Sequence, residues 1–277
     1  MKRLALITLL AASCQSTSQS EAESGAQSRL WLLMRNGRFE VSGGAADVKS
    51  SPELDPILKA AHDLQWDKVK VLAEAHLQRF PGNKDGLLLL SLAYSGLGDS
   101  ARSRFFAELV LKGHPGNAFA LNILGLLKKS SAVLPEDNRQ ALVYFQLAQQ
   151  AAPQNPIGAL NSAYLNLELG NFQEARSDFK LASTKCDDCN EARIGSALSN
   201  QALGLFDEAK IDIDAVLARE ESHPVALLLL ATQSLYLKKE YDESRKLLTA
   251  LLDNVQSGSE LRKEVRTMLN RMDGMAH

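Results

Sequence analysis

Two seven-residue stretches that lie 34 residues apart decide the fold of this chain: Leu169-Gly170-Asn171-Phe172-Gln173-Glu174-Ala175 and Leu203-Gly204-Leu205-Phe206-Asp207-Glu208-Ala209. In each, a glycine precedes a phenylalanine by two residues, and an alanine follows the phenylalanine after three. Glycine suits a tight turn between two helices, the aromatic ring fills the space beside the turn, and alanine permits close helix approach. A weaker third copy is Lys239-Glu240-Tyr241-Asp242-Glu243-Ser244. We therefore expect a repeated pair of helices.

The composition of the 277 residues agrees with helices rather than sheets. Hydrophobic residues make up 45% and aromatic residues only 6%. Leucine and alanine dominate, and long β-branched runs are nearly absent, which favours helix over strand. The formal net charge of −2 gives no sign of a nucleic-acid partner or an acidic tail.

Counting outward from the two stretches with a period near 34 gives six units and a final segment. The pattern resembles the tetratricopeptide repeat family, in which glycine marks the turn and proline ends the second helix. The resemblance implies an all-α, right-handed superhelix of about six helix-turn-helix repeats. The third unit needs four extra residues within 128–138, which predicts a longer loop between its helices. Ser259 should cap a final polar helix, Glu260 to Asp273, that covers the open end of the array. The predicted units are 50–83, 84–117, 118–155, 156–189, 190–224 and 225–258, followed by the capping segment 259–277.

The first thirteen residues are typical of a secretory signal. Lys2 and Arg3 provide positive charge, and the ten apolar or small residues from Leu4 to Ser13 are too few to span a bilayer. The sequence then reads Leu10-Ala11-Ala12-Ser13-Cys14, which resembles the bacterial lipobox, although Ala11 stands where that motif prefers Leu, Val or Ile. The resemblance implies cleavage after residue 13 and acylation of Cys14. An ordinary secretory signal that is cleaved nearby is the alternative.

Cleavage before Cys14 would remove two basic residues, so 29 Lys and Arg would face 33 acids and the mature charge would be −4. Gln15 follows the cysteine, where an aspartate would imply retention in the inner membrane. The resemblance therefore implies a lipid anchor in the outer membrane, with the protein facing the periplasm. Residues 14–29 contain no large apolar side chain and predict a flexible tether.

A β-hairpin is expected within residues 30–49, before the helical units begin. Asn36-Gly37, a strong signal for a two-residue turn, is flanked by the mainly apolar stretch 30–35 and by Arg38-Phe39-Glu40-Val41. A lone hairpin is marginally stable in water, so it should either pack on the helical body or dock a partner. A short amphipathic helix is a third possibility. Residues 42–46 read as a joint.

No arrangement of residues predicts catalysis, a metal or a cofactor. The five histidines are scattered, and none forms a pair four residues apart. Cys186-Asp187-Asp188-Cys189 is the one motif with possible chemistry. A zinc site would need two more ligands, and a reactive dithiol is disfavoured because two aspartates raise the thiol pKa. A structural disulfide in an oxidising compartment is the favoured interpretation.

Tetratricopeptide arrays bind partners along the concave surface that their first helices line. The resemblance implies a mostly apolar groove that suits an amphipathic helix or an extended hydrophobic segment. The alternative is that some of these residues pack between repeats. The family's clamp for C-terminal carboxylates is absent. The predicted groove residues are Leu88, Leu92, Asn122, Leu126, Leu160, Tyr164, Ile194, Leu198, Leu229, Gln233 and Tyr236.

A lipoprotein signal followed by six such repeats is similar to the outer-membrane pilotin lipoproteins of type IV pilus systems, which assist assembly or localisation of the secretin pore. The layout also resembles lipoproteins of gliding-motility complexes. The hairpin, the tether and the cysteine pair are not motifs of the pilotin family. We expect a non-enzymatic scaffold whose partners are envelope proteins and the membrane, with no nucleic acid or small-molecule substrate. A periplasmic adaptor that recruits a cell-wall enzyme is the alternative.

Overall fold

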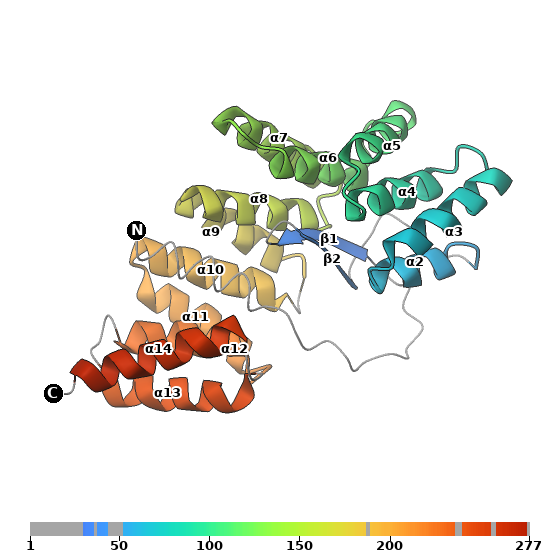
Figure 1. The fold of residues 1–277 in the computed structure, drawn as a ribbon. Coiled ribbons are helices and arrows are strands. Elements are labelled where there is room, and N and C mark those ends of the chain that lie inside the picture. Colours follow the sequence, from blue (N-terminus) through green and yellow to red (C-terminus); the bar gives the residue numbers. More distant parts are fainter. Residues whose placement is uncertain are drawn as a thin grey trace. The chain divides into compact units, whose positions relative to one another are not determined.

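The computed structural model describes residues 30–35, 38–43, 52–186, 189–235, 240–255 and 259–275. Thirteen helices follow a two-stranded sheet within these ranges (Figure 1). The elements are β1 (Leu30–Arg35), β2 (Arg38–Gly43), α2 (Asp55–His62), α3 (Trp66–Arg79), α4 (Lys84–Gly96), α5 (Ser100–Gly113), α6 (Ala118–Ser130), α7 (Pro135–Ala151), α8 (Ile157–Leu169), α9 (Phe172–Ser183), α10 (Asn190–Leu203), α11 (Phe206–Leu217), α12 (Pro224–Gln233), α13 (Tyr241–Asn254) and α14 (Glu260–Met275). The expected all-α fold of paired helices is confirmed. β1 and β2 pair in the antiparallel sense expected for the N-terminal hairpin.

The chain divides into two compact units, one within residues 22–165 and one within residues 166–277, and the boundary falls in α8. In the first unit each helix packs on the next from α2 to α7, and α4 also contacts α2 and α6. In the second unit the same sequential packing runs from α9 to α14, and α10 contacts α12. Contacts between neighbouring helices and between equivalent helices of consecutive repeats are what a repeat array requires.

The turns between paired helices follow from the repeated glycines. Gly170 has a φ of +79° and Gly204 a φ of +80°, in the left-handed region where a side chain is strained. Gly98 occupies the equivalent position in the second repeat with a φ of +81°. The first repeat carries Leu64 there instead, with a φ of +55°. A bulky residue in this conformation explains why the first repeat is the weakest copy of the pattern.

Small residues allow the helices to approach closely, as the pattern predicts. Ala175 and Ala209 are fully buried. Gly125 faces the ring of Phe145 so closely that a Cβ added to the glycine would lie 2.4 Å from Cε1 of that ring. Phe145 is itself fully buried, so its ring has no open space to move into. Gly96 faces the ring of Trp66 and Gly195 that of Phe179 in the same way, so the pairing of a glycine with an aromatic ring recurs in the array.

The extra residues of the third repeat correct one expectation. They lengthen the second helix more than the loop, because α7 has 17 residues where α5 has 14. The loop between α6 and α7, residues 131–134, is only one residue longer than the loop 97–99. Proline at the start of α7 is compatible with an added helical turn because its missing N–H has no partner there anyway.

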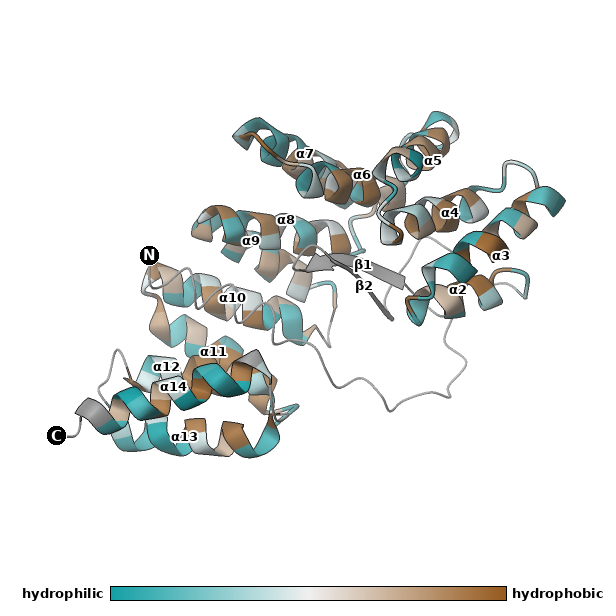
Figure 2. Cartoon of the chain, in the orientation of Figure 1, coloured by the Kyte–Doolittle hydropathy of each residue, from teal (hydrophilic) through white to brown (hydrophobic). Residues whose placement is uncertain are grey.

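The last helix has the composition of an end cap. In Figure 2 teal alternates with brown along α13 and α14, whereas α4 carries longer runs of brown. Ser259 Oγ accepts a hydrogen bond from the backbone N–H of Arg262 at 3.2 Å, as predicted for the first turn of this helix. Leu261, Val265, Met268 and Met272 are buried. The polar remainder of α14 therefore meets solvent, which a terminal repeat needs.

Candidate binding surfaces and structural sites

The predicted groove residues are mostly buried in the core. Tyr164 is half-buried, and Tyr236 lies outside the described residues. The others expose almost no surface in this conformation. Their contact with a partner stays a prediction. Burial agrees with the alternative, that they pack against neighbouring elements, for Leu88, Leu92, Asn122, Leu126, Leu160, Ile194, Leu198, Leu229 and Gln233.

The first helix of the third repeat, α6, is buried on all its faces. Every residue from Ala118 to Leu127 is buried, a run of ten that covers almost three helical turns. A helix on the surface of a protein would show a polar stripe at this point. Within the first unit, α6 contacts α4, α5 and α7, and it also contacts β1 of the hairpin. β1 thus lies beside α6, and β2 contacts α2.

Buried amides replace some of the apolar contacts between the first helices. Asn161 of α8 donates from Nδ2 to Oδ1 of Asn122 at 3.0 Å, and Asn122 donates from Nδ2 to the backbone carbonyl of Ala118 at 3.0 Å. In the second unit, Gln201 donates from Nε2 to Oε1 of Gln233 at 3.3 Å. These hydrogen bonds satisfy amides that have little access to water, so we assign them to the structure of the array.

An amide–carboxylate pair recurs at equivalent places in the fourth and fifth repeats. Asn166 Nδ2 donates to Asp178 Oδ2 at 3.2 Å, and Asn200 Nδ2 donates to Asp212 Oδ2 at 3.3 Å. Burial raises the pKa of Asp212 above its ordinary value, although hydrogen bonds and nearby arginines, led by Ser196 and then Arg193, oppose the shift. An ionised Asp212 therefore costs the fold some stability.

Exposed apolar residues recur on the second helices of the first unit, and we call this set of residues the outer stripe. It consists of Val71 on α3, Phe105 and Leu109 on α5, and Val143 and Leu147 on α7. Val71, Phe105 and Val143 stand two residues after the buried residues Val69, Ser103 and Ala141, and are 61%, 60% and 53% exposed. Scattered exposed apolar residues are normal, but these recur at one position of three consecutive repeats.

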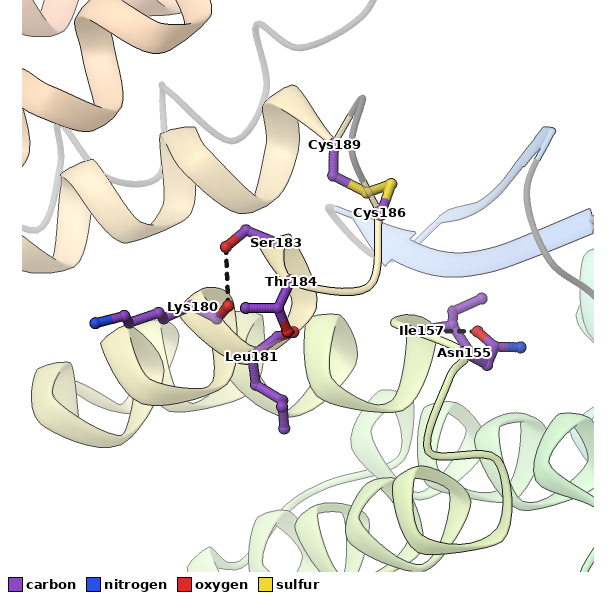
Figure 3. The surroundings of a disulfide bond; sticks show 8 residues. All are labelled: Asn155, Ile157, Lys180, Leu181, Ser183, Thr184, Cys186 and Cys189. Atoms are coloured by element: carbon purple, nitrogen blue, oxygen red, sulfur yellow. Dashed lines mark hydrogen bonds between the residues drawn. A yellow bond between two sulfur atoms is a disulfide. The ribbon is translucent and has the colours of Figure 1, made fainter.

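Cys186 and Cys189 form a disulfide, which confirms the favoured interpretation of the cysteine pair. Their Cα atoms are 5.4 Å apart. Figure 3 shows the bond between the end of α9 and the start of α10. Before it, the hydroxyls of Ser183 and Thr184 donate to backbone carbonyls of α9 and so help to end that helix. Cys189 is buried at the N-cap of α10, so the bond fixes the start of that helix.

Side chains at the equivalent N-caps of other first helices accept hydrogen bonds from the backbone. Asn83 and Asn117 accept at 2.8 Å from the N–H groups of Gly86 and Ala120. His223 takes this place before α12, and its Nδ1 accepts from the N–H of Ala226 at 3.3 Å. Burial lowers the pKa of His223, while the carboxylates of Glu220 and Glu191 oppose the shift. The neutral ring is the form that can accept this bond.

Within the described residues, no group of three His, Cys, Asp or Glu side chains is placed to hold a metal ion. Of the helices in those same ranges, none has both the length and the hydrophobicity to cross a membrane. Cys14, the predicted lipidation site, lies outside the described residues.

Comparison with solved structures identifies the fold. The similar structures include PilF from Pseudomonas aeruginosa, with a TM-score of 0.64 and 15% identity over 78% of this chain and 96% of that one. PilW, described as a widely conserved type IV pilus biogenesis factor, has a TM-score of 0.63 and 18% identity over 77% of this chain and 96% of that one. The chain has the tetratricopeptide repeat fold. YrrB, a tetratricopeptide protein with an unusual peptide-binding site, matches with a TM-score of 0.54 and 17% identity over 70% of this chain and 97% of that one.

No protein-family model matches the sequence, and no curated protein matches it either. The tetratricopeptide pattern is therefore recognisable by its spacing and not by overall similarity. Sequence reasoning missed the outer stripe, although a signal for it was present. Val71, Phe105 and Val143 each follow a small or β-branched residue of the repeat by two positions, and a solvated helix face would not keep an apolar residue there in three consecutive repeats.

Proposed function

We propose that this protein is a lipid-anchored scaffold that binds other proteins and assists the assembly or localisation of an envelope complex. The observation that carries the proposal is the likeness to PilF and PilW, which spans 96% of each of those chains. The likeness extends over 77% and 78% of this chain. PilW is a type IV pilus biogenesis factor, so a pilus secretin is the first partner to test.

The sequence of the first thirteen residues supports an anchor at Cys14 on the periplasmic side of the outer membrane. Two or more acyl chains would hold the protein stably, whereas one chain alone binds a membrane weakly. Replacement of Cys14 by serine should abolish incorporation of a radiolabelled fatty acid and leave the protein unprocessed or soluble. Equal labelling of the variant and the unmodified protein would contradict the anchor.

Affinity capture after mild crosslinking of envelope proteins tests the scaffold itself. Recovery of a secretin would support the pilus role, and recovery of motility proteins would move the protein to a gliding complex. Recovery of a cell-wall hydrolase or synthase would favour the adaptor alternative. Capture of no envelope protein above the level seen with an unrelated lipoprotein would contradict the proposal.

Two substitutions locate the surface that binds. Tyr164 is the half-buried member of the predicted groove set, and Phe105 is the most prominent aromatic residue of the outer stripe. Alanine at an aromatic anchor should weaken capture by about 1–3 kcal/mol. Loss of capture with Tyr164→Ala would indicate binding at the groove, and loss with Phe105→Ala would indicate binding at the outer stripe. Thermal melting of both variants identifies a loss that is due to unfolding.

A further inference from the structure

The exposed aromatic ring of the outer stripe is held in place by other side chains. Phe105 is 60% exposed, and its ring meets that of Phe106 edge to face with the centroids 5.2 Å apart. Phe106 in turn stacks on Tyr94 at 5.6 Å, and the guanidinium of Arg102 lies 4.6 Å from the centroid of the Tyr94 ring. A ring that is already held in one orientation loses little entropy when a partner covers it. Phe105 is therefore placed to anchor a binding partner.

Positive charge accompanies the outer stripe on α3 and α5. The two helices together carry six basic residues and three acidic ones, which gives a net charge of +3. The acidic residues are Asp67, Glu74 and Glu108. Lys68 lies three residues before Val71 and Lys112 lies three residues after Leu109, so each lysine shares a helix face with an apolar member of the stripe. Both lysines are exposed, and neither forms an ion pair within the part of the chain that the structure describes.

Helix α11 carries the opposite charge around an exposed apolar residue. Ile211 is 68% exposed, and Asp207 and Glu208 lie four and three residues before it on the same helix face. Asp214, three residues after Ile211, forms an ion pair with Lys210. The helix holds four acidic residues and one basic residue, which gives a net charge of −3. Asp207 and Glu208 are exposed and have no ion-pair partner among the described residues, so their charges are available to another molecule.

Ile211 and Phe105 occupy the same position of their repeats. Ile211 stands two residues after the buried Ala209, just as Phe105 stands two residues after a buried serine of α5. In the other two second helices of the second unit this position carries a polar residue, Ser177 in α9 and Lys246 in α13. The repeat pattern therefore does not require an apolar residue there. An exposed apolar side chain surrounded by acidic residues is particular to α11.

We propose that this protein associates with a second copy of itself, and that the outer stripe on α3 and α5 of one copy docks on α11 of the other. Phe105 would meet Ile211 at the centre of the contact, with the lysines of one surface facing the acidic residues of the other. Net charges of +3 and −3 attract, whereas two copies of either surface repel each other. The contact joins two different surfaces, so further copies can add to either end. It depends neither on the proposed anchor nor on an envelope partner.

Carbodiimide crosslinking of the full chain in a mild detergent tests where the copies touch. The reagent joins a lysine amine to a carboxylate only where the two groups are in direct contact. Ordinary and isotopically labelled protein are mixed, so that a crosslink between copies joins one labelled peptide to one unlabelled peptide. We expect such mixed crosslinks between Lys68 or Lys112 and Asp207 or Glu208. Crosslinks at these residues within single copies only, or none at all, would overturn the proposal.

Charge reversal tests whether the two surfaces are complementary. The first variant is Lys68→Glu with Lys112→Glu, and the second is Asp207→Lys with Glu208→Lys. In each variant alone the two surfaces carry charges of one sign, so recovery of an untagged copy on a tagged copy of the same variant should fall at least about ten-fold. A mixture of the two variants has opposite charges at every contact and should recover the association. Absence of association in the mixture would refute the pairing of these surfaces.

Two controls separate docking at these surfaces from a general effect of net charge. Arg266→Glu with Arg271→Glu reverses two exposed charges on α14, as the first variant does on α3 and α5, and should leave recovery unchanged. Ile211→Ser in both members of the mixture should lower recovery at least about three-fold, because the apolar centre of the contact is lost. Equal loss with the α14 variant, or full recovery with Ile211→Ser, would show that net charge and not these surfaces drives the association.

Discussion

Leu64 occupies the turn position that glycine holds in three other repeats, and this predicts an unusual response to substitution. Leu64 has a φ of +55°, close to the left-handed conformation of Gly98, Gly170 and Gly204. That conformation costs a residue with a Cβ about 1–2 kcal/mol. We expect that the side chain at this position, and not the turn, is the source of strain in the first repeat.

The test compares Leu64→Ala with Leu64→Gly, because both remove a side chain that is 47% exposed and they differ in one Cβ. Glycine at residue 64 removes about 1–2 kcal/mol of backbone strain that alanine would retain. This gain is partly offset by about 0.5–1 kcal/mol, because glycine has more conformational entropy in the unfolded chain. The glycine variant should therefore be more stable than the alanine variant by about 0.5–1 kcal/mol. Urea unfolding followed by circular dichroism measures the difference.

Gly113 provides the matched control. It is the last residue of α5, its φ is not positive, and a Cβ added there would meet nothing within 4 Å. Gly113→Ala should therefore stabilise the protein by about 0.5–1 kcal/mol. At residue 113 alanine is thus expected to be more stable than glycine, whereas at residue 64 glycine is expected to be more stable than alanine. An alanine at residue 64 that equals or exceeds glycine in stability would refute the argument from backbone strain.

Four further outcomes follow from the packing, the buried groups and the disulfide. Gly125→Ala should destabilise the protein by about 1–3 kcal/mol in urea unfolding, since the new methyl group would overlap a buried ring; a neutral result would show that the core relaxes easily. Asp212→Asn should match the unmodified protein in stability near pH 3.5 and exceed it near pH 7. The raised pKa of Asp212 means that ionisation of its buried carboxyl group, as the pH rises, destabilises the folded protein. A constant difference in stability across this pH range would contradict that sign. As the pH falls from 8 to 5, the melting temperature of the unmodified protein should decrease relative to that of His223→Asn. The lowered pKa of His223 means that the neutral ring contributes its full stability above about pH 6.5 and loses that contribution at lower pH. Parallel pH profiles of the two proteins would argue against a titrating cap. Cys186→Ser with Cys189→Ser should cost about 1–2 kcal/mol, the chain-entropy effect of a four-residue loop, and mass spectrometry without reductant should find the two residues linked in the unmodified protein.

The sequence by itself determined the repeated elements. Local rules suffice for this, because Gly170 and Gly204 stand where a turn requires positive φ, and Ala175 and Ala209 stand where two helices touch. The disulfide was also within reach, since two cysteines three residues apart with no further metal ligands leave few alternatives. These features depend on residues that are close together in the chain.

Only the tertiary structure decided which side of each helix is exposed to solvent or to a binding partner. The repeat pattern places Leu88, Asn122 and Leu126 on the inner side of their helices, but exposure depends on what other segments cover. The register of β1 and β2 and their contacts with α6 and α2 join segments that are up to about ninety residues apart. The hydrophobic effect is non-directional, so the sequence of an apolar face does not tell whether a partner, a neighbouring repeat or another segment of the same chain covers it. The fold of the whole chain makes that choice.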